Sequence, residues 1–265
     1  MLKISNAEYH ARPEISKSQL DMIRDAPYKF KNAHLYRKEG AQFVMGSAFH
    51  TMVLEPELFN SEYVVAPSLE LRTKAGKEAM AEFTASAGSR AILKADEYET
   101  LQKMTEAVNN NIYCKALLSG AIVEGSVISN LEGVPVRARF DAYNQKINCL
   151  IDLKSTVDSS PAAFAKSAAN YRYHVQDAFY GDILANEGYA VDKFVFIVVS
   201  KTTHEVGIYD LDNTAREFGR DSYIKDLETY KWCKENNTWP LYEDFESGEV
   251  KPVRTITLPN YAYYQ

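Results

Sequence analysis

The segment Lys193–Ser200, Lys-Phe-Val-Phe-Ile-Val-Val-Ser, constrains the fold most, because it is apolar without a break from Phe194 to Val199. Successive side chains of a strand point to opposite faces of its sheet. A strand that is apolar on both faces is typical of a buried, central position. Residues 205–209, Glu-Val-Gly-Ile-Tyr, follow it and favour an edge strand. The chain therefore needs a sheet that other layers cover.

Three further segments predict strands ahead of that run. Residues 121–129 are rich in β-branched side chains, residues 133–141 alternate in character, and residues 147–154 are again mostly apolar. Asn144-Gln145 suits a tight turn between the last two. We expect the three strands to form an antiparallel meander.

Helical patterns account for much of the remaining chain. We predict helices over residues 15–24, 44–54, 95–118, 173–186 and 215–232, and one more opened by Ser160-Pro161. Ser16 and Gln19 form a capping-box pattern at the first helix, and Gly188 marks the end of a later one. Residues 72–77 predict a basic loop that enters a helix, and the tail past Trp239 is expected to be irregular.

No internal repeat or low-complexity linker interrupts the 265 residues. We therefore predict one domain over residues 1–265, of the α/β class, with a central mixed β-sheet flanked by helices and a helical N-terminal part. The composition suits it, since 46% of the residues are hydrophobic and 25% are charged, as in an ordinary globular protein.

Several classes of protein are disfavoured by composition. The cysteines Cys114, Cys149 and Cys233 are scattered, so a zinc knuckle or a four-cysteine iron–sulfur cluster is not expected, and a reduced, cytoplasmic location is. No signal-peptide pattern and no apolar run of membrane-spanning length occur, so no membrane partner is expected. The net charge of −6 argues weakly against nucleic-acid binding. Net charge is an average over the whole chain, however. A metal-dependent nuclease must carry a cluster of carboxylates, whose charge bound cations offset locally, so a negative net charge does not exclude it.

The residues that point to chemistry are Asp141, Asp152 and Lys154. Asp152 and Lys154 are two positions apart, so they share one face of a strand, and the hairpin can bring Asp141 across from Asp152. Two close carboxylates repel unless a cation lies between them, and oxygen ligands favour Mg²⁺ or Mn²⁺. A solvated hairpin with a salt bridge would show the same pattern. The apolar surroundings of Asp152 favour the metal site, because buried charges need partners.

Three other positions are candidates. Gln176 and Tyr180 are four apart on a predicted helix, where they could hold water or a phosphate near the carboxylates. A half-buried aromatic stripe would give the same spacing. His50 lies on an apolar helix and Glu124 on a β-branched strand, and each is equally consistent with a plain structural role.

Several blocks of sequence, in order along the chain, resemble the nuclease domain of RecE, the exonuclease VIII of prophage recombination systems. The blocks are Ile15-Ser-Lys-Ser-Gln-Leu, Gly46-Ser-Ala-Phe-His, Leu54-Glu-Pro-Glu, Val65-Ala-Pro, Thr73-Lys-Ala-Gly-Lys, Asp152-Leu-Lys-Ser-Thr and Tyr171-Arg-Tyr-His-Val-Gln-Asp-Ala-Phe-Tyr. The resemblance runs from about residue 4 to residue 259. It implies a PD-(D/E)XK nuclease fold with RecB-type motifs.

The resemblance also implies roles for individual residues. Metal ligands would be Asp141 and Asp152, the Leu153 carbonyl, the additional histidine His50 and, by a looser match, Glu124. Lys154 would activate or position the attacking water, and Gln176 and Tyr180 match the QxxxY motif. The cofactor would be Mg²⁺, with Mn²⁺ as a substitute, and two ions would hydrolyse the phosphodiester bond.

The activity so implied is 5′→3′ digestion of one strand of linear double-stranded DNA, which leaves a 3′ overhang. Expected partners are the DNA, a RecT-type single-strand annealing protein and further copies of the chain in a ring, with a tetramer favoured. We expect DNA contacts from these residues: Arg12, Ser16, Lys17, Arg72, Lys74, Lys77, Arg137 and Arg139. For Ser16, plain helix capping is an equal alternative. Rival functions are a Cas4-like nuclease, which would need clustered cysteines, a restriction-type enzyme, and a non-catalytic DNA-binding scaffold.

Overall fold

The structure, a computed structural model, describes residues 1–36, 41–246 and 249–263. Its centre is a five-stranded sheet in the order β3-β4-β5-β6-β7. The strands are β3 (Ile122–Leu131), β4 (Val134–Asn144), β5 (Cys149–Thr156), β6 (Lys193–Ser200) and β7 (Val206–Asp210). The first three form the predicted antiparallel meander, β5 pairs with β6 in parallel, and β7 returns antiparallel at the edge. The sheet is therefore mixed, as predicted.

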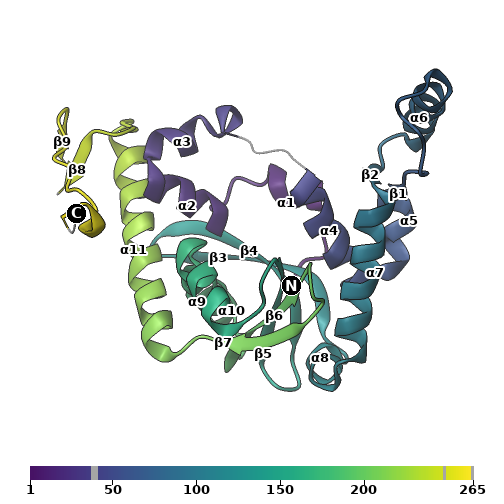
Figure 1. The fold of residues 1–265 in the computed structure, drawn as a ribbon. Coiled ribbons are helices and arrows are strands. Elements are labelled where there is room, and N and C mark those ends of the chain that lie inside the picture. Colours follow the sequence, from purple (N-terminus) through teal and green to yellow (C-terminus); the bar gives the residue numbers. More distant parts are fainter. Residues whose placement is uncertain (37–40, 247–248, 264–265) are drawn as a thin grey trace.

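The parallel step from β5 to β6 needs a crossover, which two helices supply. They are α9 (Pro161–Asn170) and α10 (Tyr173–Asn186). Together with α2 (Lys17–Asp25) and α11 (Asn213–Glu235) they bury one apolar core against the sheet, including Phe164, Phe179 and Phe196. Figure 1 shows α10 lying on this side of the sheet with α11 outside it.

The other face of the sheet carries a second core. It joins α4 (Ala41–Leu54) and α7 (Ala95–Asn110) to the strands through Phe49, Leu101 and Ile151. The sheet residues alternate between the two cores along β5, with Leu150 in the first and Ile151 in the second. Central burial of β6 on both faces, predicted from its unbroken apolar run, is confirmed.

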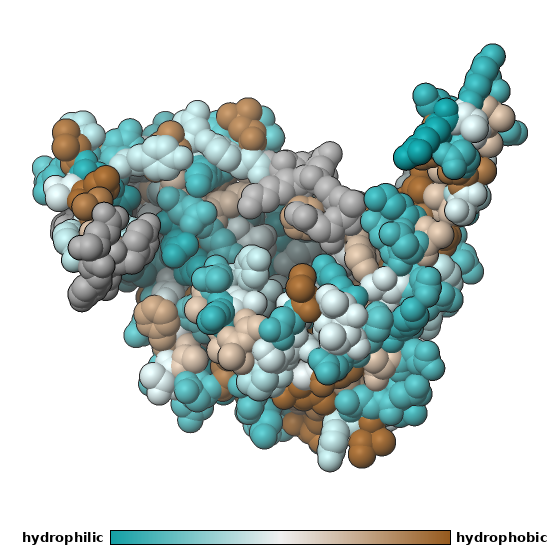
Figure 2. All heavy atoms as spheres, in the orientation of Figure 1, coloured by the Kyte–Doolittle hydropathy of each residue, from teal (hydrophilic) through white to brown (hydrophobic). Residues whose placement is uncertain are grey.

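Shorter elements complete the N-terminal part and the C-terminal end. They are α1 (Asn6–Ala11), α3 (Pro27–Lys31), η1 (Ala33–Leu35), η2 (Pro56–Leu58), α5 (Phe59–Glu62), β1 (Tyr63–Val65), α6 (Lys74–Ala87), β2 (Ala91–Leu93), α8 (Ile112–Leu118), β8 (Asp244–Glu246), β9 (Glu249–Lys251) and η3 (Asn260–Tyr263). Strands β1 and β2 pair in parallel around α6. Figures 1 and 2 show α6 at the tip of an arm that projects from the body, with mostly hydrophilic side chains at the tip.

Three predictions about secondary structure are wrong in part. The helix predicted over residues 95–118 is two helices, because Asn111 is extended and its side chain accepts from the amides of Tyr113 and Cys114, which caps α8 anew. The tail past Trp239 contains the β8–β9 hairpin rather than only irregular chain. Strand β4 also continues past Asp141 to Asn144.

Within the described ranges, no helix is both long and apolar enough to cross a membrane. The single domain over 1–265 stays a prediction.

Candidate active site

Three carboxylates lie side by side across three neighbouring strands. Ala142 pairs with Ile151, which places Asp141 of β4 next to Asp152 of β5. On the other side, Val123 and Gly125 pair with Ala142 and Phe140, so Glu124 of β3 lies opposite Asp141. The register of the meander thus gathers charges that the sequence places far apart.

Glu124 departs from ordinary strand geometry. Its backbone φ of +50° lies in the left-handed region, which residues other than glycine rarely occupy. Such strain persists where surrounding contacts enforce it, often at functional sites. Here the carboxylate accepts from Arg139 Nε at 2.7 Å, and Arg139 also donates to the carbonyl of Ile4 at 2.9 Å. Burial and the charge of Asp141 raise the pKa of Glu124.

His50 of α4 completes a convergent group. Its Nδ1 lies 3.4 Å from Asp141 Oδ1. One ligand atom each of His50, Glu124 and Asp141 lies within 4.8 Å of the others, which is the spacing at which three side chains can share one ion. One nitrogen and two carboxylate oxygens suit a divalent metal, with the nitrogen favouring Mn²⁺ or similar ions beside Mg²⁺.

The group opens onto a cavity of about 460 Å³ between α4 and the β3–β4 pair, lined also by Thr51 and Arg139. Burial disfavours the imidazolium of His50, but the carboxylates of Asp141 and then Asp152 outweigh it and raise the pKa of His50 to about 9. The bound proton neutralises part of the carboxylate charge. A metal ion would do so more fully, so the donor set fits a cation.

Asp141 is fixed by its second oxygen. Its Oδ2 accepts from the backbone amide of Leu153 at 2.7 Å. Burial alone would raise the pKa of Asp141, but His50 and Lys154 lower it, so the group is a carboxylate. The structure thus brings Leu153 to Asp141 through its amide. Ligation by the Leu153 carbonyl stays a prediction.

Asp152 lies outside the convergent group and faces α10 instead. Its Oδ2 is 2.5 Å from Lys154 Nζ, and its Oδ1 accepts from Gln176 Nε2. Gln176 Oε1 also accepts from Lys154 Nζ at 3.4 Å. Burial raises the pKa of Asp152, and the ammonium of Lys154 opposes that rise. Gln176 therefore contacts both members of the Asp152–Lys154 pair, and its predicted contact with water or a phosphate stays a prediction.

Tyr180 lies one helical turn beyond Gln176, half-buried beneath β4. Burial raises the pKa of its hydroxyl well above the usual value, and Tyr9 adds to that, so it stays protonated. The QxxxY spacing predicted from sequence does place both side chains toward the carboxylates. A contact of Tyr180 with water or phosphate stays a prediction.

Most of the predicted DNA-contacting residues near the N-terminus make internal contacts. Arg12 forms an ion pair with Glu14 at 2.6 Å. Arg137 is buried and donates to the carbonyls of Arg12 and Glu14. Ser16 is buried as the N-cap of α2, where its backbone amide donates to Gln19. These contacts favour structural roles for the three predicted residues.

The remaining basic candidates fall into two places. Arg139 and Lys17 make contacts within the body of the domain: Arg139 holds Glu124, and Lys17 donates to Asp21 on α2 at 2.8 Å. A second set lies exposed at the start of α6, on the projecting arm and away from the cavity; it comprises Arg72, Lys74 and Lys77. The structure therefore does not unite the predicted DNA contacts in one surface.

Sequence reasoning missed the roles of Tyr173, which lies beside Lys154, and of Arg172, which precedes α10. The ring of Tyr173 lies 4.7 Å from Lys154 Nζ, measured to the ring centroid. Arg172 precedes it with a φ of +55° and forms ion pairs with Asp21 and Asp226. The signal was present in the Tyr-Arg-Tyr sequence ahead of Gln176, but only the fold shows what each ring touches.

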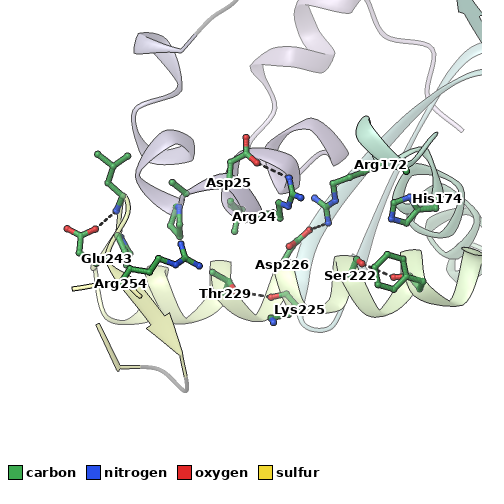
Figure 3. Close-up of a pocket in the computed structure, with 17 residues that line it drawn as sticks. Arg24, Asp25, Arg172, His174, Ser222, Lys225, Asp226, Thr229, Glu243 and Arg254 are labelled. Carbon is green, nitrogen blue, oxygen red and sulfur yellow. Dashed lines mark hydrogen bonds and ion pairs between the residues drawn. The ribbon is translucent and has the colours of Figure 1, made fainter. Parts of the chain in front are cut away.

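A second cavity of about 450 Å³ lies between α2, α11 and the C-terminal segment. Figure 3 shows the ion pair of Arg172 with Asp226 at its wall and His174 beside α11. Burial lowers the pKa of His174, so it is neutral near pH 7. This cavity brings no group of potential metal ligands together among the described residues, so the chemistry is expected at the first cavity.

Comparisons with known proteins identify the family and the fold of the chain. Residues 16–254 match the family model of the PDDEXK-like domain of unknown function, DUF3799. The fold is similar, with a TM-score of 0.64, to a crystal structure from Eubacterium rectale described as a "putative exonuclease", at 12% identity over 98% of this chain and 96% of that one. A phage related exonuclease from Haemophilus somnus 129PT is 16% identical over 62% of this chain and 85% of its own, but its TM-score of 0.34 is too low to indicate a shared fold.

None of the curated proteins compared with the chain matches it. The family model spans nearly the whole chain, and the register of β4 and β5 places Asp141 next to Asp152. The chain belongs to the PDDEXK-like domain family DUF3799 and has the mixed α/β fold of that superfamily.

Proposed function

We propose that the protein is a divalent-metal-dependent exodeoxyribonuclease that digests one strand of linear duplex DNA from the 5′ end and leaves a 3′ overhang. The observation that supports it most is the convergence of His50, Glu124 and Asp141 beside the buried Asp152–Lys154 pair. A cluster of like charges inside a domain is costly unless a cation shares it. In a nuclease with the PDDEXK-like fold, such a cation would take part in the hydrolysis of a phosphodiester bond.

In this proposal His50, Glu124 and Asp141 hold the metal, and Asp152 completes the ligand set from the next strand. When bound, Mg²⁺ or Mn²⁺, as one or two ions, supplies Lewis-acid polarisation of the phosphate. Lys154 places an ammonium beside the carboxylates, where it orients the attacking water and offsets charge on the phosphate. Gln176 keeps Lys154 and Asp152 aligned through its two hydrogen bonds.

The direction of digestion and the partners rest on the resemblance to RecE. A 3′ overhang is the product that a RecT-type annealing protein uses, and a ring of copies, four by that resemblance, would keep the enzyme on its duplex. A cytoplasmic location belongs to the same proposal. The Cas4-like alternative has no support, because the three cysteines are buried and free on separate elements.

The test uses linear duplex DNA labelled at either 5′ or 3′ end, a closed circle of the same sequence, and Mg²⁺, Mn²⁺ or EDTA. We expect loss of the linear substrate only with metal, early release of the 5′ label, and an intact circle. Asp141→Asn is expected to abolish digestion, whereas Glu99→Gln, on the exposed face of α7, should leave it unchanged. Cleavage of the circle, or digestion in EDTA, would refute an end-dependent metal nuclease.

A further inference from the structure

An exposed aromatic ring lies at the joint between α9 and α10. Tyr171 is 64% exposed, so most of its ring is open to solvent. Its inner face stacks on Tyr173, with the ring centroids 5.8 Å apart and an angle of 28° between the planes. One face of Tyr171 is therefore covered by a ring and the other is open.

The stack leads directly to Lys154. Tyr173 lies under Lys154 Nζ at 4.7 Å from its ring centroid. It is also fixed from behind, since it stacks on Phe164 at 5.9 Å and on Phe196 at 5.7 Å. The open face of Tyr171 is thus the outer end of a rigid row of rings that begins in the core and passes the lysine of the site.

The backbone at this joint is locked by buried charges. Arg172 is 7% exposed and has a left-handed backbone with φ of +55°. Its guanidinium donates to Asp21 at 2.9 Å and to Asp226, the second pair being visible in Figure 3. Lys17 Nζ further donates to the Tyr171 carbonyl at 2.7 Å. A strained residue held by two ion pairs fixes where Tyr171 projects.

The chemistry around the ring is that of a single nucleic-acid strand. Lys17 Nζ lies 2.7 Å from the Tyr171 carbonyl oxygen, and Lys154 Nζ lies 4.7 Å from the centre of the Tyr173 ring, so each of the two tyrosines has a lysine beside it. Proteins that bind single strands combine such cations, which follow the phosphates, with rings on which bases stack. A base inside a duplex has no free face, whereas a base at a separated end does.

We infer that Tyr171 and Tyr173 form a base-stacking subsite, in which Tyr171 receives the nucleobase next to the phosphodiester that is cut. This inference rests on the proposed nuclease function. The subsite tolerates any base, because every base has a π-face, and it holds the terminal nucleotide apart from its complement. The ring therefore favours ends and single strands over the interior of a duplex.

The test compares Tyr171→Ala and Tyr171→Phe with Tyr113→Ala, a control that removes a similarly exposed tyrosine (66%) from α8. Affinity for a labelled single-stranded oligonucleotide is measured by anisotropy with Ca²⁺ in place of Mg²⁺, and intact length is checked on a gel. Stacking on one ring predicts an affinity about 5- to 150-fold weaker for Tyr171→Ala. Tyr171→Phe and Tyr113→Ala should bind as the wild type does.

A second readout separates the inference from the proposed function. In Mg²⁺, Tyr171→Ala should raise KM for linear duplex far more than it lowers kcat, with unchanged thermal melting. Unchanged affinity and KM in a folded Tyr171→Ala protein would overturn the subsite. So would loss of self-association alone, since the ring would then be a protein contact. A wild-type protein that binds oligonucleotide through Tyr171 but cuts no DNA would refute the nuclease instead.

Discussion

The ion pair between Lys154 and Asp152 can be tested by replacing Lys154 with methionine, which keeps the length of the side chain and removes its charge. The Asp152 side chain is only 6% exposed and that of Lys154 21%. The variant leaves a buried carboxylate beside Asp141 without its nearest cation. Removing one partner of a buried pair costs about 3–5 kcal/mol. For a chain of this size that lowers Tm by roughly 6–20 °C.

The stability of the Lys154→Met variant should depend on pH, because the carboxylate of Asp152 has lost its cation. Burial already raises the pKa of Asp152, and loss of the ammonium raises it further. The folded state then holds a proton that the unfolded state releases, so stability falls as pH rises through the folded pKa. We expect Lys154→Met to be nearest wild-type stability at pH 5 and farthest at pH 8.

The assay is thermal and urea unfolding in EDTA at both pH values, with the double variant Lys154→Met/Asp152→Asn as control. The double variant removes both charges and should return to within about 1 kcal/mol of the wild type. Mg²⁺ or Mn²⁺ should stabilise the single variant more than the wild type, because the site then has more uncompensated carboxylate. A single variant as stable as the wild type at pH 8 in EDTA would refute the buried pair.

Three further outcomes are expected. The pKa of His50 is raised to about 9 in the folded protein, whereas it is about 6.5 in the unfolded chain. The metal-free protein should therefore lose up to roughly 3 kcal/mol of stability between pH 6.5 and 9. Urea titrations should show this loss in the wild type and not in His50→Gln. Gly219→Ala should destabilise by about 1–3 kcal/mol, because a Cβ would meet the His174 carbonyl oxygen on α10; a Tm equal to that of the wild type would contradict this helix contact. Arg172→Ala leaves Asp226 buried without its cation and should cost about 3–5 kcal/mol at pH 7, which calorimetry with an Asp226→Asn background can check.

The site was predictable where its residues follow local periodicity. Asp152 and Lys154 share a strand face because side chains alternate, and Gln176 and Tyr180 share a helix face because they are one turn apart. The turn after Asn144 sets the hairpin register that brings Asp141 beside Asp152. Each of these relations is fixed by residues near one another in the chain.

Other features of the site depend on contacts between distant segments. His50 reaches Asp141 only because α4 packs on one face of the sheet, whereas Gln176 reaches Asp152 from α10 on the other. Four carboxylate or imidazole ligands were predicted from the sequence. In the structure, Asp152 pairs with Lys154 and does not join the convergent group of His50, Glu124 and Asp141. Partner choice among charged side chains is decided by burial and distance, which sequence spacing does not contain.

The sheet and most of the helices could be predicted from the sequence, because an unbroken apolar strand and a β-branched meander can be buried in few ways. The motif residues of the sequence also indicated where on the sheet the charges would lie. The left-handed backbone of Glu124 opposite Asp141, and that of Arg172 beside Tyr171, could not be predicted from the sequence. Both follow from the way in which distant ion pairs hold a backbone that its own residues would not adopt.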